Sequence, residues 1–142
     1  MTPEEEIAFL AEQRTMTIAT MSPTGQFHLV AMWYVIIDGR ITFWTFAKSQ
    51  KAANLRRDSR ITCLVHSGDA YGELRGVEVT GTATVVDAVD DVFAVGRAIA
   101  QRYGDLVPLA SDADIEAQAR RRIAVVVQPT SIVGWDHSKL AT

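Results

Sequence analysis

The chain has 142 residues, of which 48% are hydrophobic and 22% charged, and its formal net charge is −3. This length fits one domain over residues 1–142, with a core large enough to need no disulfide. The slightly acidic balance argues against nucleic-acid binding, and no apolar stretch approaches the roughly 20 residues of a membrane span. Cys63 is the single cysteine and no leader-like segment opens the chain, so we expect a cytoplasmic protein.

The first half of the chain predicts strands joined by tight turns, with two short helices. Thr2-Pro3-Glu4-Glu5 has the capping pattern of a helix start, with proline at the first helical position. Asp38-Gly39 between two apolar runs is typical of a two-residue hairpin. The predicted elements are a helix from residue 3 to about 13, strands at 15–21, 27–37 and 40–46, a helix at 49–58 and a strand at 60–66.

The second half adds two strands and two helices. Gly76 and Gly81 lie inside the strand at 74–86 and indicate a bend or bulge, and Pro129 interrupts the last strand. Because the strands come in runs joined by short hairpins, a parallel βαβ sheet is disfavoured. We expect a mainly β fold, a six-stranded antiparallel barrel with peripheral helices. Helices are predicted at 87–103 and 111–121, and the last strand at 123–128, continuing over 131–135.

The segment Lys48-Ser49-Gln50-Lys51 follows a strand and begins a helix, with Ser49 as the predicted N-cap. The positive end of the helix dipole makes this position unfavourable for Lys51 unless an anion binds there. The pattern therefore fits a phosphate held by free backbone N–H groups, Lys48 and Lys51. It fits two solvated surface lysines equally well.

Other basic residues gather near helix ends. Arg56, Arg57 and Arg60 follow the same helix, and the run 120–122 closes a later one. Basic residues are favoured at helix C-termini, which accounts for both groups. The first group also fits an enlarged positive rim for a longer anionic tail.

A set of large apolar residues gathers on the hairpin around Asp38-Gly39. Because side chains alternate along a strand, both faces of this hairpin are apolar. One face can fill the core, while the other can meet a partner subunit or a flat conjugated ligand. These residues are Met32, Trp33, Tyr34, Phe43, Trp44 and Phe46.

The sequence predicts no hydrolytic or metal-binding arrangement. Cys63 and His66 are three residues apart on a strand and therefore face opposite sides. Asp136-His137 lacks a plausible serine elbow. His28 follows a turn and fits an ordinary residue at a strand end.

Several segments follow one another in an order and at a spacing that match a known protein family. They are residues 25–33, Phe43-Trp44-Thr45-Phe46, Ser49-Gln50-Lys51-Ala52, Arg60-Ile61 and residues 75–83. This arrangement resembles the split β-barrel flavin and deazaflavin oxidoreductases, the superfamily that includes pyridoxamine-phosphate oxidase. The short chain is most similar to the small F420-dependent reductases of actinobacteria. True pyridoxamine-phosphate oxidases end in an arginine-containing segment, which this chain lacks.

The resemblance implies a homodimer that holds its cofactor in a groove at the interface. It assigns cofactor-binding roles to ten residues. Ala31, Met32 and Trp33 would contact the ring, Trp44 and Thr45 would line the path to the phosphate, Lys48, Ser49, Gln50 and Lys51 would hold the phosphate, and Trp135 from the other subunit would close the pocket.

The resemblance also implies the activity, which is hydride transfer from reduced coenzyme F420 to an electron-poor unsaturated small molecule. The alternatives are an FMN-dependent oxidase or reductase, and a non-enzymatic flavin- or tetrapyrrole-binding protein in which His28 or His66 could bind iron. Tyr34, Tyr71 and His137 are candidate proton donors, and no catalytic residue is assigned. Loops at 67–73 and 104–110 are expected to build the substrate pocket.

Overall fold

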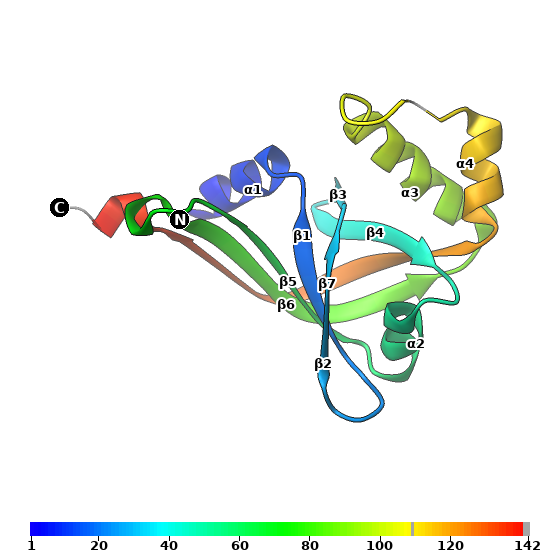
Figure 1. Cartoon of the computed structure of the whole chain (residues 1–142), viewed down its shortest axis with the longest axis horizontal. Helices are drawn as coiled ribbons and strands as arrows, with labels where there is room; N and C mark the ends of the chain where they lie inside the picture. Colours follow the sequence, from blue (N-terminus) through cyan, green and yellow to red (C-terminus); the bar gives the residue numbers. More distant parts are fainter. Residues whose placement is uncertain (109, 141–142) are drawn as a thin grey trace.

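The computed structural model describes residues 1–108 and 110–140, so residue 109 of the predicted loop lies outside the described residues. Its seven described strands form a single antiparallel sheet in the order β2-β1-β5-β6-β7-β4-β3 (Figure 1). The mainly β prediction is confirmed. The strands are β1 (Met16–Met21), β2 (Phe27–Met32), β3 (Val35–Ile37), β4 (Arg40–Phe46), β5 (Arg60–Ser67), β6 (Arg75–Val86) and β7 (Arg122–Asp136).

The predicted count of six strands is wrong, because the apolar run 27–37 is two strands. β2 pairs with β1 and β3 pairs with β4, so the chain changes partner at Trp33 and Tyr34. The backbone N–H of Tyr34 donates to the hydroxyl of Tyr103 instead of to a strand. Its carbonyl accepts from Arg102 and from the same hydroxyl. Side chains far along the sequence thus replace the ladder hydrogen bonds at the break.

The predicted interruption at Pro129 is a bulge inside one continuous strand. The pairing of β6 with β7 shifts register between Thr80 and Gly81, and Gly81 lies opposite Pro129. A Cβ on Gly81 would lie 2.0 Å from the carbonyl oxygen of Gln128, so the two backbones approach too closely for any side chain. The predicted irregularity at Gly81 is confirmed.

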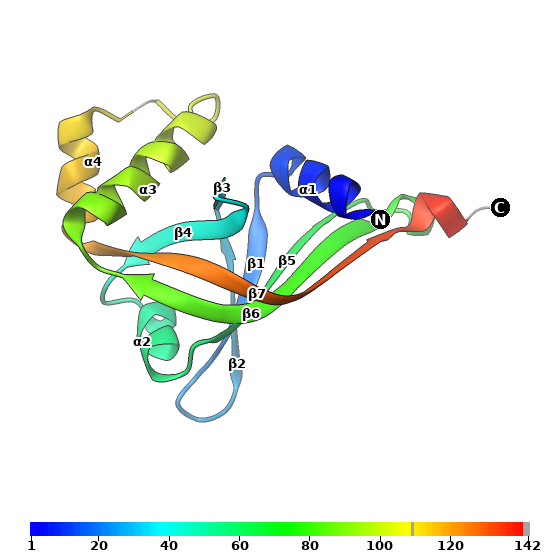
Figure 2. The same ribbon diagram turned by 180° about the vertical axis from the view of Figure 1, so that it is seen from behind.

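Helices cover the two ends of the sheet. α1 (Pro3–Glu12) begins with the predicted capping box, in which Thr2 and Glu5 exchange hydrogen bonds of 3.2 and 2.7 Å. α3 and α4 pack together beside β4 and β7, at the end opposite α1 (Figure 2). The remaining helices are α2 (Gln50–Arg57), α3 (Val89–Arg102), α4 (Asp112–Ala119) and the short 3-10 turns η1 (Tyr71–Glu73) and η2 (His137–Leu140).

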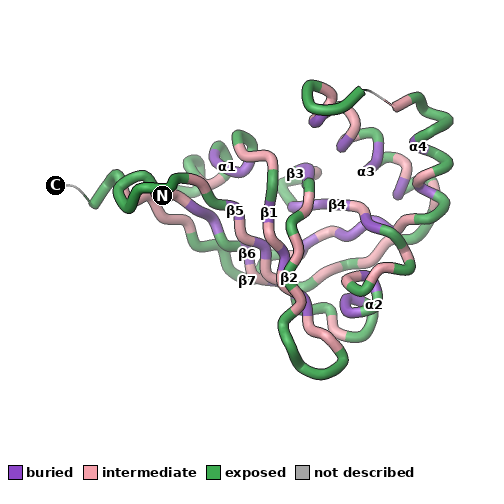
Figure 3. Tube along the Cα trace, in the orientation of Figure 1, coloured by how far each residue is buried: buried purple, intermediate pink, exposed green. Residues whose placement is uncertain are grey.

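Two hydrophobic clusters hold these layers together. In the barrel, Ile18, Cys63 and Val79 lie opposite one another on β1, β5 and β6, and all three are buried. Figure 3 shows buried stretches along the strands of the sheet. The second cluster joins α3 and α4 to β4 and β7 and includes Val92 and Tyr103. The alternation along the strands buries one face of β1, β5 and β6 and leaves the other facing outward.

The ends of β5, β6 and β7 project beyond the barrel with η1 and η2, and we call residues 67–76 and 134–140 the arm (Figure 1). α1 lies along the arm and is tied to it by two salt bridges, Glu12 to Arg75 at 3.1 Å and Glu5 to Lys139 at 2.7 Å. None of the described helices is both long and apolar enough to cross a membrane.

Candidate functional site

Six of the ten predicted site residues line one cavity of about 300 Å³, which we call the aromatic pocket. They come from the end of β2, from β4 and from the first turn of α2, elements that are separate in sequence. The lining residues are Ala31, Met32, Trp33, Trp44, Thr45, Phe46, Lys51, Ile99 and Arg122.

Trp44 forms one wall of the aromatic pocket and is held from behind by α3. A Cβ on Gly96 would lie 2.3 Å from Cζ3 of Trp44, so the ring packs directly on the helix backbone. On β7, Arg122 pairs with Phe46 and its guanidinium lies over two rings, 4.2 Å from the centroid of Phe46 and 4.7 Å from that of Trp44. These are cation–π distances, so the aromatic residues fix this charge at the pocket.

The first turn of α2 is capped as predicted. The backbone N–H of Ala52 donates to Oγ of Ser49 at 3.2 Å, and Oγ1 of Thr45 lies 3.4 Å from the same oxygen. The N–H groups of Gln50 and Lys51 have no partner among the described residues, as expected at a helix start. The Gln50 side chain is engaged elsewhere, since it donates to Asn54 at 2.8 Å. Gln50 can therefore offer its backbone N–H, while its side chain supports the helix.

Two cations at the aromatic pocket are partly withdrawn from water. Burial lowers the pKa of the Lys51 ammonium. Burial, and next the charge of Arg121, lower the pKa of the Arg122 guanidinium. Neither Lys51 nor Arg122 forms a salt bridge with a described residue. A bound anion would relieve both effects, because it supplies the missing counter-charge.

A second cavity of about 500 Å³ adjoins the first at Phe46, and we call it the basic hollow. It contains the predicted residues Lys48 and Ser49 together with Arg120 and Arg121, which the sequence had indicated only as the charged end of a helix. The lining residues are Phe46, Ala47, Lys48, Ser49, Arg120 and Arg121. The two cavities together bring five cations to one end of the molecule. One of them, Arg120, forms a salt bridge of 2.8 Å with Glu116.

Trp135 is the predicted residue that lies apart from the others within one chain. Arg122 and Trp135 stand near the two ends of β7, up to about 40 Å apart at roughly 3.3 Å per residue. The indole of Trp135 lies over Gly76 in the arm, where a Cβ would be 2.2 Å from its ring. Loop 67–73, predicted to build a substrate pocket, also lies at the arm. Both predictions therefore require a second chain.

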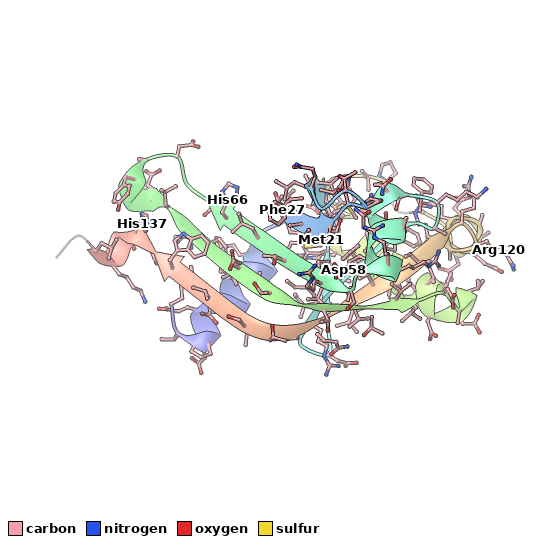
Figure 4. The ribbon with its side chains drawn as sticks, turned by 90° about the horizontal axis from the view of Figure 1, so that it is seen from below. Met21, Phe27, Asp58, His66, Arg120 and His137 are labelled. Atoms are coloured by element: carbon pink, nitrogen blue, oxygen red, sulfur yellow. The ribbon has the colours of Figure 1, made fainter. Side chains whose placement is uncertain are left out.

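The candidate proton donors lie away from the aromatic pocket. Tyr34 is fully buried and its hydroxyl donates to the backbone of α1, at 2.6 Å to the oxygen of Leu10. Tyr71 and His137 contact each other in the arm, where Nδ1 of His137 lies 2.9 Å from the backbone carbonyl oxygen of Tyr71. Figure 4 shows His137 on the arm, His66 on the part of β5 next to it, and Arg120 at the opposite end.

The histidines considered for iron also lie outside the aromatic pocket. His28 faces inward on β2 and its Nδ1 is buried without a hydrogen-bond partner in the described part of the chain. His66 is exposed on β5. Residues 1–108 and 110–140 contain no group of three or more His, Cys, Asp or Glu side chains that could hold a metal ion.

Two of the three arginines expected to form a basic rim after α2, Arg57 and Arg60, are engaged in local contacts. Arg57 donates to the backbone oxygen of Met21, and Arg60 forms a salt bridge of 2.6 Å with Asp58. Hydrogen bonds from Arg60 lower the pKa of Asp58 to about 2. The positive charge near the aromatic pocket comes instead from the start of β7 and the end of α4.

Comparison with known proteins identifies the family to which this fold belongs. The family model described as pyridoxamine 5'-phosphate oxidase matches residues 2–136, nearly the whole chain. The chain belongs to the pyridoxamine 5'-phosphate oxidase family. Its curved antiparallel sheet with peripheral helices is the split-barrel fold of that family.

Solved structures extend the comparison. The conserved hypothetical protein Rv2991 from Mycobacterium tuberculosis is 39% identical over 100% of this chain and 89% of its own, with a TM-score of 0.91. A protein titled F420 reductase is 26% identical over 93% of this chain and 98% of its own, with a TM-score of 0.72. HutZ, a heme storage protein from Vibrio cholerae, is 12% identical over 92% of both chains, with a TM-score of 0.69, and shares the fold. No curated protein matches the sequence.

For this member of the pyridoxamine 5'-phosphate oxidase family, sequence reasoning missed three residues of the aromatic pocket: Phe46, Ile99 and Arg122. Phe46 could have been found, because it follows Trp44 by two residues and so shares its face of β4. Ile99 and Arg122 could not, because only the packing of α3 and β7 brings them to the pocket.

Proposed function

We propose that this protein is an oxidoreductase that binds the deazaflavin coenzyme F420 and transfers a hydride to an electron-poor unsaturated small molecule. The observation that carries the proposal is the joining of the aromatic pocket to the basic hollow. The 26% identity with a protein titled F420 reductase supports the same choice. FMN, with one phosphate and no anionic tail, is the alternative occupant.

The described residues fit a phosphorylated aromatic cofactor. Trp33 and Trp44 offer flat apolar walls for a conjugated ring. Lys51 and the free N–H groups of the first turn of α2 suit the phosphate. Lys48 and Arg121 line the hollow beyond it, where the glutamate carboxylates of an F420 tail would find opposite charge, and Arg120 lines it while paired with Glu116.

Reduced F420 would supply the hydride when bound, and solvent would supply the proton that completes the reduced product. The protein's own contribution is to position the acceptor and to exclude water from the ring. Thr45, buried on β4, and Ser49 complete a polar path between the ring walls and the start of α2. The described residues that line the aromatic pocket include no Asp or Glu, and this chemistry needs none.

We infer that a second copy of this chain covers the outer face of the sheet. One row across that face runs from Ala31 through Thr17, Leu64 and the exposed Glu78 to Val133, so it connects the edge of the aromatic pocket to the arm. Phe27, Leu29 and Val133 on this face are 75%, 64% and 52% exposed. Apolar side chains gathered in this way are typical of an interface. A partner on this face could bring its Trp135 to the pocket, which one chain cannot do alone.

The phosphate assignment is tested by charge removal with a matched control. Lys51→Met and Arg122→Met should each raise the Kd of FMN and of F420 about 10- to 100-fold, the usual value of a charge-assisted hydrogen bond. Binding of riboflavin, which lacks the phosphate, should change little in Lys51→Met. Arg97→Met, which removes an exposed charge of α3 that lines neither cavity, should leave all Kd values unchanged.

Activity is tested separately by mixing reduced F420 with a panel of electron-poor unsaturated acceptors and following its reoxidation. Turnover with at least one acceptor supports the reductase, whereas tight binding without turnover favours a non-enzymatic binder. Light scattering measures the assembly, and Leu29→Glu should convert a dimer to a monomer. A monomeric parent protein would contradict the second copy on the sheet face.

A further inference from the structure

Trp33, one wall of the aromatic pocket, rests on a second aromatic ring that does not line it. The indole of Trp33 and the phenol ring of Tyr103 are parallel within 6°, with centroids 4.1 Å apart. Tyr103 is fully buried, while Trp33 is 37% exposed and lines the pocket. One face of the indole is therefore covered by Tyr103, and the surface that remains is what a ligand in the pocket can touch.

Tyr103 is itself held in one orientation. Its hydroxyl accepts from the N–H of Tyr34 and from the guanidinium of Arg102, both at 3.1 Å. Its proton is directed at two backbone oxygens, 2.7 Å away on Arg14 and 2.9 Å away on Tyr34. A phenol hydroxyl can donate one hydrogen bond and accept two, so the hydrogen-bonding capacity of this hydroxyl is filled. Turning the ring would leave buried polar groups unpaired, which is costly.

The same helix supports both tryptophan walls. Tyr103 ends α3, and Gly96, about two turns earlier, lies directly behind Trp44. Ile99 lies between them along α3 and lines the aromatic pocket. The spacing places all three on one face of the helix. The distance between the two walls is therefore set by α3 and not by the strands alone.

We propose that Tyr103 is a positioning residue: by fixing the indole of Trp33, it sets the affinity of the aromatic pocket for the flat ring of the cofactor. This inference rests on the proposed function and refines it, because Tyr103 itself does not touch the ligand. The contribution of a well-placed aromatic pair predicts a loss of about 3- to 10-fold in affinity when the stack is removed.

The test is a double-mutant cycle on the full chain. Tyr103→Leu should raise the Kd of F420 and of FMN about 3- to 10-fold, and Tyr103→Phe, which keeps the ring, should raise it less. In a Trp33→Ala background, Tyr103→Leu should have no further effect, because the residue it acts through is gone. Phe9→Leu is the matched control, since Phe9 is an equally buried aromatic residue on α1 that does not line the aromatic pocket. Equal losses from Tyr103→Leu in both backgrounds, or from Phe9→Leu, would overturn the proposal.

A second readout needs no cofactor. Acrylamide quenching of Trp33, taken as the difference between the protein and Trp33→Phe, should increase in Tyr103→Leu and stay unchanged in Phe9→Leu. Unchanged quenching in Tyr103→Leu would overturn the proposal whatever the binding data show. If the unmodified protein binds neither F420 nor FMN, the proposed function fails, and the quenching still decides whether Tyr103 holds the indole. If Tyr103→Leu does not fold, Tyr103→Met, which also removes the ring, carries both readouts with the same expected results.

Discussion

Helix propensity and steric packing predict opposite effects of Gly96→Ala on the free energy of unfolding. Alanine inside a helix is favoured over glycine by about 0.8–1 kcal/mol of intrinsic propensity. At this position, however, the added Cβ would lie 2.3 Å from Cζ3 and 2.6 Å from Cη2 of Trp44. Overpacking of this kind costs about 1–3 kcal/mol, because either the ring or the helix must move. We expect the steric cost to exceed the propensity gain and the free energy of unfolding to fall by about 1 kcal/mol.

Urea denaturation measures this change, and two variants separate its parts. Ala94→Gly, at an exposed position of the same helix, gives the propensity difference alone. Trp44→Phe removes the outer ring, so Gly96→Ala should be neutral or stabilising in that background. Because Trp44 lines the aromatic pocket, Gly96→Ala should also weaken cofactor binding. The reasoning is refuted if Gly96→Ala raises stability by the full propensity value and leaves binding unchanged.

Three further predictions concern the framework around the site. Asn54→Ala should lower the free energy of unfolding by about 1–3 kcal/mol, because it removes a buried 3.0 Å hydrogen bond to Thr20; a loss below about 0.5 kcal/mol in urea denaturation would contradict this. The folded-state pKa of Asp58 is lowered to about 2, so its stabilisation is present above the ordinary carboxyl pKa and is lost as pH falls toward 2. Asp58→Asn should therefore flatten the fall in stability measured between about pH 4 and pH 2, and an unchanged slope would contradict the assignment. Burial raises the pKa of the Cys63 thiol to about 12, so a thiol reagent at neutral pH should label it only after unfolding; fast labelling of the native protein would show that the core opens there.

Structural features that depend only on residues close together in the sequence could be predicted from it. The capping box at Thr2 and Glu5, the cap at Ser49 and the bulge at Gly81 all depend on chemistry within a few residues. The helix start at Ser49 pointed to Lys51, whereas the resemblance to a known family supplied Ala31, Met32, Trp33, Trp44 and Thr45; all six line one cavity.

Features set by distant contacts could not be predicted in the same way. The run 27–37 is apolar throughout, and its break at Tyr34 depends on hydrogen bonds from Arg102 and Tyr103, almost 70 residues later. Arg122 follows two other arginines after a helix, so dipole matching explained it locally. Only the pairing of β7 with β4 places its charge on the ring of Phe46.

The central claim, that the aromatic pocket and the basic hollow together bind F420, is tested most directly by a calorimetric competition titration of the purified protein. F420 should bind more tightly than FMN and should displace it completely. F420 with a longer glutamate tail should bind no more weakly than F420 with a short one, and its affinity should fall more steeply with salt than that of FMN. Tighter binding of FMN would move the protein to the flavin branch of its family, and binding of neither cofactor would contradict the assigned site.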